Sequence, residues 1–126
     1  MSDVRYVLGD TETTGAGPGH KAVEIAWVEL DSDLQVLNRV HSLIDPERPI
    51  SAGASGVHGI VAADVTEAPT LEEFFTILEP NAFVHPTVFC AHKVDFDLPY
   101  FKPYIPNLVG TLCTLKLARR YLLDAE

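Results

Sequence analysis

The chain has 126 residues, of which 47% are hydrophobic and 21% are charged. This length builds one core and is too short for two domains, and the composition is that of a globular protein rather than a disordered or fibrous one. Eighteen acidic residues against nine Lys and Arg give a net charge of -9. That balance argues against a protein that grips nucleic acid through a broad basic face. It leaves open an enzyme that meets phosphate groups through divalent cations, because the ions then supply the positive charge.

The first residues give no sign of a secretory signal or a membrane anchor. Asp3 and Arg5 lead straight into the apolar residues Tyr6, Val7 and Leu8, without a basic segment, a long apolar stretch or a cleavage site. We therefore expect a cytoplasmic protein that does not associate with membranes.

The two cysteines, Cys90 and Cys113, both lie in apolar runs and lack the spacing of metal-binding or redox-active pairs. They predict reduced residues of the core. No disulfide framework is expected.

Three β-type runs open the chain. Residues 4–12 form an apolar run that ends in acidic side chains and is broken by the turn-forming residues 13–19. Residues 21–30 and 34–44 are two further runs, and the connection between them is short enough for a hairpin. These runs predict an antiparallel three-stranded meander.

The middle of the chain combines an irregular segment with a clear helix signal. Residues 45–69 carry prolines and glycines without a period, which predicts a long surface excursion with room for short helical turns. Thr70 and Glu73 then form a capping box, and Pro80 closes the helix that follows it. The apolar positions of this helix, at i, i+3, i+4 and i+7, are Leu71, Phe74, Phe75 and Leu78.

Strands and helices alternate in the last third. Residues 87–91 and 108–113 predict strands, residues 95–105 a short helix, and residues 114–122 a helix with an apolar face. A meander followed by such an alternation predicts an α/β fold with a mixed sheet and helices on its faces. We expect one domain over residues 1–126.

Asp10 and Glu12 end the first predicted strand. Because strand side chains alternate with a period of two, both carboxylates project from the same face. They repel each other unless a cation lies between them, and hard divalent ions such as Mg²⁺ or Mn²⁺ prefer oxygen ligands. The pair indicates a metal site. The plain alternative is two solvated residues at a strand end.

A second acidic cluster follows the predicted strand at 87–91, where Asp95 and Asp97 lie in the first turn of a helix. Together with residues 10–15 it resembles the motifs D-x-E-T-T-G and A-H-N-x-x-F-D of the DnaQ-like (DEDD-type) 3′-5′ exonucleases. Residues 23–26, 57–60 and 114–120 are also similar to that family and come in the right order. The last of these stretches is most similar to the exodeoxyribonuclease X type. The resemblance covers residues 4–121.

The resemblance implies a ribonuclease-H-like fold with helices on both faces of its sheet. It also implies a hydrolase that cuts phosphodiester bonds from nucleic-acid 3′ ends in DNA replication or repair, with single-stranded DNA favoured and RNA also possible. Asp10, Glu12 and Asp97 match the family's catalytic residues and its ligands for two Mg²⁺ or Mn²⁺ ions, which activate a water and stabilise the leaving oxygen. Thr13 and His58 match contacts to the terminal nucleotide, although His58 alone also fits an ordinary surface-loop histidine.

Two features depart from the family pattern. Lys93 stands where the second motif usually has Asn, and we expect it to approach a substrate phosphate, the alternative being an exposed lysine. The third motif, a His followed five residues later by an Asp on a further helix, would lie beyond Tyr121, whereas the sequence ends at Glu126. That His is the family's general base, and we assign its role to no residue here.

Three hypotheses follow. The first is an exonuclease domain truncated before its third motif and weakly active or inactive alone. The second is a catalytically incomplete relative that binds nucleic acid or a partner. The third is an α/β protein whose acidic cluster is structural.

The two carboxylates of the second motif cannot both face one site. Residues two apart on a helix differ in direction by about 200°. We therefore predict that Asp97 binds metal and that Asp95 is the helix N-cap.

Overall fold

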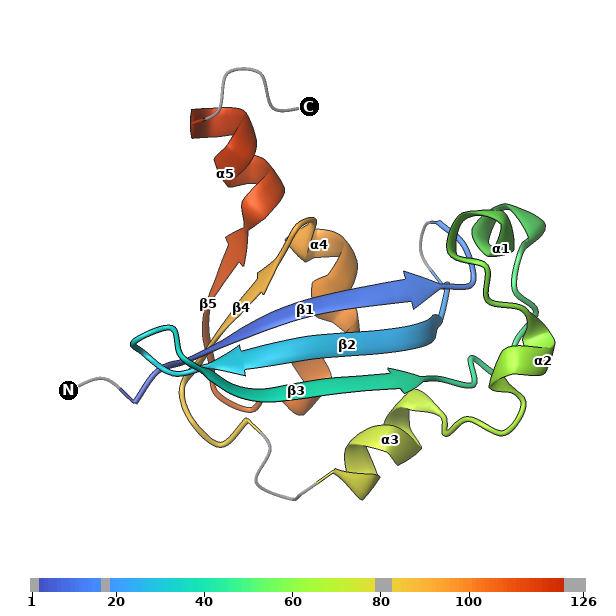
Figure 1. Cartoon of the computed structure of the whole chain (residues 1–126), viewed down its shortest axis with the longest axis horizontal. Helices are drawn as coiled ribbons and strands as arrows, with labels where there is room; N and C mark the ends of the chain where they lie inside the picture. The colour runs from blue at the N-terminus through green and yellow to red at the C-terminus, as the bar shows by residue number, and fades with distance from the viewer. Residues whose placement is uncertain (1–2, 17–18, 79–82, 122–126) are drawn as a thin grey trace. The chain divides into compact units, whose positions relative to one another are not determined.

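The computed structural model describes residues 3–16, 19–78 and 83–121. Within them, five strands form a sheet in the order β3-β2-β1-β4-β5. The strands are β1 (Arg5–Thr13), β2 (Ala22–Leu30), β3 (Val36–Leu43), β4 (Thr87–Ala91) and β5 (Leu108–Cys113). β4 pairs in parallel with both β1 and β5, whereas β2 runs opposite to β1 and β3 (Figure 1). The predicted mixed sheet with an antiparallel opening is confirmed.

Short helices fill the connections. The excursion after β3 holds α1 (Ala52–His58) and α2 (Ala62–Val65), and α3 (Leu71–Ile77) follows it. The capping box of α3 is formed as predicted, because Glu73 N–H donates to Thr70 Oγ1 at 3.2 Å and Thr70 N–H donates to Glu73 Oε1 at 3.1 Å. Pro80 and Leu122, which the sequence analysis used to bound two helices, lie outside the described residues.

The helix predicted over residues 95–105 is broken into three pieces. α4 (Val94–Asp97) is one turn long and is followed by the 3₁₀ turns η1 (Leu98–Tyr100) and η2 (Lys102–Tyr104). Pro99 and Pro103 explain the break, because proline lacks an N–H and its ring clashes with the carbonyl four residues before it. Each of them is the second residue of a 3₁₀ turn instead.

The contacts within the chain divide it into two units, and β1 and β2 each contribute residues to both units. Unit 1 comprises Met1–Asp10, Trp27–Val40 and Phe83–Glu126, and unit 2 comprises Thr11–Ala26 and His41–Ala82. The core of unit 2 contains Val23, Ile60 and Val65, with partly buried residues packed against them. Those residues are Leu43, Ile50 and Ala68.

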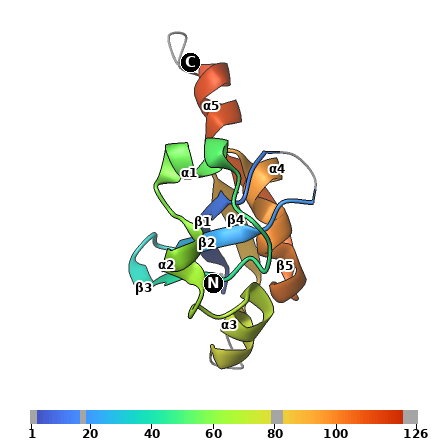
Figure 2. The same ribbon diagram turned by 90° about the vertical axis from the view of Figure 1, so that its right-hand side faces the viewer.

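The core of unit 1 is aromatic. The ring of Phe101 lies 4.7 Å from that of Phe89 and 5.7 Å from that of Trp27, measured between centroids, and Trp27 also contacts Phe83 at 5.4 Å. Aromatic pairs at such distances add to the free energy of burial, by about 0.5–1.5 kcal/mol each. In Figures 1 and 2, α5 (Thr114–Tyr121) continues directly from the end of β5 in this unit.

The cysteines differ in their surroundings. Both are free thiols; Cys90 is buried as predicted, whereas Cys113 is partly exposed. The prediction of a core residue was wrong for Cys113, because its strand β5 alternates between exposed and half-buried positions instead of being covered. No helix among the described residues is long and apolar enough to cross a membrane.

Candidate active site

Asp10 and Glu12 lie on the less buried face of β1. Burial alternates along this strand: Val7, Gly9, Thr11 and Thr13 are buried, while Leu8 and Asp10 are exposed and Glu12 is half-buried. The two-residue period of the strand therefore directs both carboxylates to one face. That face is the one that does not pack on the core.

Gly9 lets the aromatic core lie directly beneath this part of the strand. A Cβ atom at Gly9 would come within 2.6 Å of Phe89 Cε1 and 2.7 Å of Phe101 Cζ. These are closer than real Cβ contacts, so any other residue would displace the strand or the rings. The backbone next to Asp10 is thus held against a rigid surface.

The two aspartates of α4 have opposite surroundings, as their spacing requires. Asp97 is 4% exposed, whereas the side chain of Asp95 is 84% exposed and accepts a hydrogen bond from Lys116 Nζ at 3.3 Å. Asp95 is not the N-cap, because α4 begins at Val94 after an N-cap at Lys93 without a side-chain cap bond. The prediction of that cap was wrong by two residues.

Asp97 affects the pKa of the neighbouring Tyr100 side chain. Burial raises the pKa of Tyr100, and the nearby Asp97 carboxylate raises it further. Asp97 is thus a buried carboxyl group at the N-cap of η1, close to the Tyr100 side chain.

The donor chemistry of these residues suits a hard divalent ion. Asp10, Glu12 and Asp97 offer only carboxylate oxygens, which Mg²⁺ and Mn²⁺ prefer. However, over residues 3–16, 19–78 and 83–121 the structure shows no group of three or more His, Cys, Asp or Glu side chains placed to hold a metal ion. In the described part of the chain these carboxylates are therefore candidate ligands that are not gathered into a group of three.

Thr13 and His58 are brought together in unit 2. His58 Nε2 lies 2.9 Å from the Thr13 carbonyl oxygen, and His58 Nδ1 accepts the Ile60 N–H at 3.0 Å. Because Nδ1 is an acceptor, Nε2 carries the proton and donates it to Thr13. Both ring nitrogens are thus used inside the protein. The Thr13 hydroxyl in turn donates to Gly15 O at 2.7 Å.

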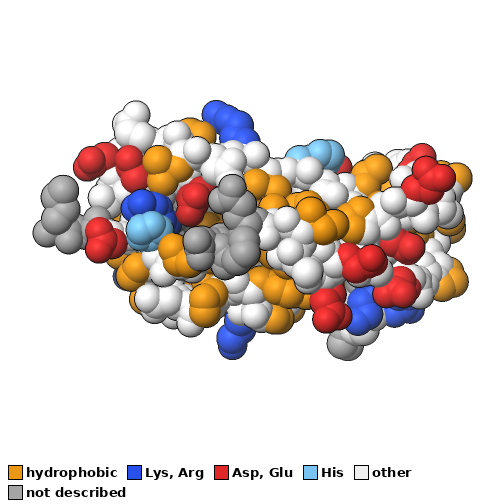
Figure 3. Space-filling model, turned by 90° about the horizontal axis from the view of Figure 1, so that it is seen from below, with side chains coloured by type: hydrophobic (Ala, Val, Ile, Leu, Met, Phe, Trp, Pro, Cys, Tyr) orange, Lys and Arg blue, Asp and Glu red, His pale blue; other side chains and the backbone are white. Residues whose placement is uncertain are grey.

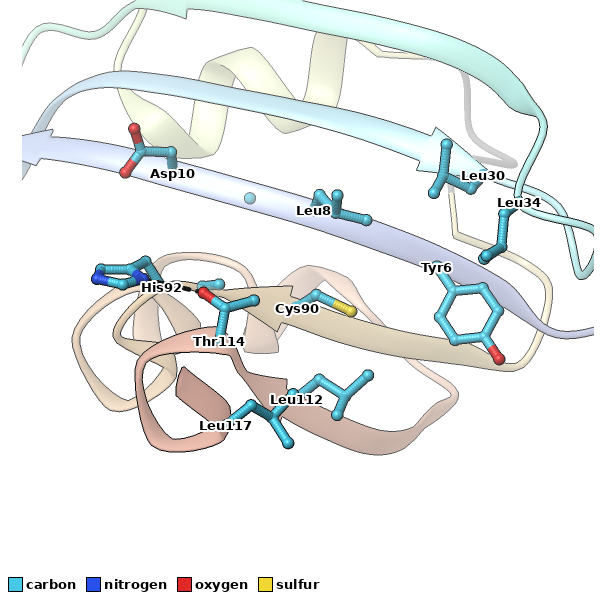
Figure 4. Close-up of a pocket in the computed structure, with 12 residues that line it drawn as sticks. Tyr6, Leu8, Asp10, Leu30, Leu34, Cys90, His92, Leu112, Thr114 and Leu117 are labelled. Atoms are coloured by element: carbon cyan, nitrogen blue, oxygen red, sulfur yellow. Dashed lines mark hydrogen bonds between the residues drawn. The ribbon is translucent and has the colours of Figure 1, made fainter. Parts of the chain in front are cut away.

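A groove of about 640 Å³ in unit 1 was not foreseen from the sequence. Figure 4 shows Asp10 and His92 at one of its ends and apolar side chains along the rest, with His92 Nδ1 3.0 Å from Thr114 Oγ1. The apolar lining comes from Tyr6, Leu8, Leu30, Leu34, Cys90, Leu112 and Leu117. Leu8 and Asp10 are two residues apart and therefore share one face of β1, and this spacing was a signal in the sequence for a groove on that face.

Comparison with known proteins identifies relatives of this chain. The profile of the RNase_T exonuclease family matches residues 7–125. Exodeoxyribonuclease 10 of Escherichia coli K12 is 35% identical over 112 residues, a match that covers 88% of this chain and 46% of that protein. DNA polymerase III subunit epsilon of Rickettsia typhi is 30% identical over 144 residues, covering 99% of this chain and 62% of that protein.

A solved structure agrees with these relatives. Exonuclease X in complex with 5′ overhanging duplex DNA superposes with a TM-score of 0.67 at 30% identity, covering 94% of this chain and 65% of that one. The chain therefore spans between about half and two thirds of these relatives' length. Its ribonuclease-H-like mixed sheet and its family match over residues 7–125 lead to one conclusion: the chain belongs to the DnaQ-like exonucleases.

Proposed function

We propose that this chain serves as the metal-dependent nuclease part of a 3′-to-5′ exonuclease that acts on DNA. The observation that carries the proposal is the placement of Asp10 and Glu12 on one face of β1, together with a buried Asp97 at the end of α4, the short helix after β4. These are the positions of the two carboxylate motifs, and the family match runs through both.

Asp10, Glu12 and Asp97 are the residues proposed to hold divalent ions, as members of this family generally use them. Held there, two Mg²⁺ or Mn²⁺ ions would supply an activated water and would stabilise the departing 3′ oxygen. Gly9 and the rings under it keep Asp10 in place, and His58 holds the carbonyl of Thr13 next to Glu12. We propose that His58 acts on the substrate indirectly, by fixing Thr13 at the end of β1 beside the place of the terminal nucleotide.

The substrate assignment rests on the relatives. Exodeoxyribonuclease 10 and the polymerase III epsilon subunits are named for work on DNA, and Exonuclease X was solved with a 5′ overhanging duplex. In such a duplex the recessed strand carries the 3′ end. We therefore assign a DNA 3′ end as the substrate. As the family resemblance implies, we further propose that single strands are favoured and that the protein acts in the cytoplasm.

The test begins with metal binding. Mn²⁺ titration by calorimetry should show binding to the 126-residue chain, and Asp10→Asn and Asp97→Asn should each weaken it, with exposed Asp64→Asn on α2 as the control. Absent or unaffected binding would sink the proposal. With Mn²⁺ present, oligonucleotides labelled at the 5′ or 3′ end then report polarity, and RNA of the same sequence reports the sugar preference. Shortening from the 5′ end would contradict the assignment.

Turnover by these 126 residues should be low. They contain no third motif, and a missing general base typically costs a factor of about 10² to 10⁴ in rate. Metal and DNA binding without any detectable turnover, even after long incubation with Mn²⁺, would instead favour a relative that binds nucleic acid without cutting it.

A further inference from the structure

A second hollow, of about 350 Å³, lies in unit 1 and is lined by three cationic side chains: Lys93, Lys116 and Arg119. The whole sequence has only nine Lys and Arg, so a third of them meet here. On the face drawn in Figure 3, by contrast, acidic, basic and apolar side chains are interspersed among the coloured residues. The hollow is a local concentration of positive charge on an acidic protein.

The positions of the three cations follow from the local fold. Lys93 is the N-cap residue of α4, at the turn that follows β4. Lys116 and Arg119 are three residues apart on α5, so they share one face of that helix. Their charged ends therefore converge from two elements on one opening.

Backbone groups add to the positive character. The pKa of the thiol of Cys113, a further lining residue, is lowered by the backbone N–H groups of Val94 and Lys116 first, and also by that of Leu115 and by the Lys116 charge. A site that stabilises a thiolate is one that favours anions generally.

Among the described residues that line the hollow, Asp95 is the only acidic one. Its carboxylate is 3.3 Å from Lys116 Nζ, but both side chains are largely exposed, at 84% and 69%. Such exposed ion pairs contribute little to stability. An anion that binds in the hollow can therefore replace Asp95 as the partner of Lys116 at little cost in free energy.

We propose that this hollow binds a backbone phosphate of the nucleic-acid substrate, through Lys93, Lys116 and Arg119. The proposal rests on the proposed function and extends it, because it adds a contact that needs no metal ion. Phosphate suits the lining, since lysine supplies a mobile point charge and arginine a planar fork that can make two parallel hydrogen bonds. The contact also explains how an acidic chain gains affinity for a polyanion: a few cations are gathered at one point.

The first experiment measures binding of a labelled single-stranded DNA to the 126-residue chain by fluorescence anisotropy, in EDTA, over a series of salt concentrations. Each phosphate contact contributes about 0.7 to the slope of log K against log salt for single strands. Lys116→Gln and Arg119→Gln should each weaken binding and lower the slope, and the two replacements together should lower it by up to about that amount. Asp95→Asn should strengthen binding.

Arg120→Gln is the matched control. Arg120 is on the same helix and carries the same charge, but it lies 5.6 Å over the ring of Tyr121 and does not line the hollow. It should leave the slope unchanged. Equal losses for Arg119→Gln and Arg120→Gln would show diffuse attraction to α5 and would overturn the assignment.

The second experiment uses Cys113 as a reporter inside the hollow. Iodoacetamide should alkylate Cys113 while buried Cys90 resists, and a saturating oligonucleotide should slow the reaction of Cys113 in the native chain. In the Arg119→Gln variant this protection should be reduced at the same oligonucleotide concentration. An oligonucleotide that binds without protecting Cys113 would place the bound strand elsewhere.

The two proposals fail in distinguishable ways. Both hollow experiments run without divalent ions, so they do not depend on Asp10, Glu12 or Asp97. A chain that binds no Mn²⁺ but shows the Arg119-dependent slope and Cys113 protection would retain the phosphate contact while losing the nuclease assignment. A chain that binds Mn²⁺ but shows neither effect would retain the nuclease assignment while losing the phosphate contact.

Discussion

His58 Nε2 lies 2.9 Å from the carbonyl oxygen of Thr13, and this contact ties the end of α1 to the end of β1. The ring is fixed by a second bond, from Ile60 N–H to Nδ1 at 3.0 Å. Two residues that the sequence associated with the terminal nucleotide are therefore bonded to each other.

We predict that His58→Ala lowers the free energy of unfolding by about 1–2 kcal/mol, because two hydrogen bonds worth about 0.5–1.5 kcal/mol each are lost. Urea denaturation measures this. His41→Ala is the control: His41 Nε2 contacts Glu24 Oε2 at 2.6 Å, but its side chain is 61% exposed, so the change should stay within about 0.5 kcal/mol. Equal losses of unfolding free energy for the two variants would mean that the hydrogen bonds of His58 do not stabilise the fold.

Asp97→Asn should abolish or strongly weaken Mn²⁺ binding, while Asp95→Asn should leave it nearly unchanged. The reason is direction: Asp97 is buried at the start of η1, whereas Asp95 is exposed and paired with Lys116. Calorimetric titration of both variants decides between them. The assignment fails if Asp95→Asn removes binding and Asp97→Asn retains it.

Tyr100 should titrate above its ordinary pKa of 10.0, because burial and the Asp97 charge both disfavour the phenolate. Because the pKa of Tyr100 is higher in the folded than in the unfolded state, its neutral phenol contributes to the stability of the fold. This contribution is complete below pH 10 and is lost as the pH rises through the pKa of the folded state. Absorbance of the phenolate in Asp97→Asn, compared with the native chain, should show a lower pKa for one tyrosine. An identical titration in both would remove Asp97 as a cause.

Gly9→Ala should destabilise the fold by about 1–3 kcal/mol, the usual cost of overpacking, because the added methyl group collides with Phe89 and Phe101. Gly53→Ala offers a matched control, since a Cβ at Gly53 in α1 meets nothing within 4 Å. In a helix that replacement should stabilise by about 0.5–1 kcal/mol. Thermal unfolding of the two variants should therefore shift in opposite directions.

The sequence predicted the strands best, because each is a short apolar run between strong turn signals. The bounds of β4 and β5 were predicted to the residue. The helix after β4 was not, since its apolar pattern persists through Pro99 and Pro103 although the backbone bonds cannot.

The candidate carboxylates were found by spacing and motif, whereas their surroundings needed the fold. Nothing near Thr13 in the sequence signals that a histidine 45 residues later bonds to its carbonyl. The hollow likewise joins Lys93 to residues more than 20 positions further on. Local patterns report the residues that chemistry requires, but contacts distant in sequence decide which of them meet.

His92 fastens the beginning of α5 to the turn after β4. Its carbonyl oxygen accepts the Leu115 N–H at 3.0 Å and the Cys113 thiol at 3.4 Å, and its ring contacts Thr114. α5 is therefore bonded to the same short piece of chain from which α4, the helix of Asp97, starts. We expect a substitution of Lys116 or Arg119 to change, through His92, how firmly Asp97 is held.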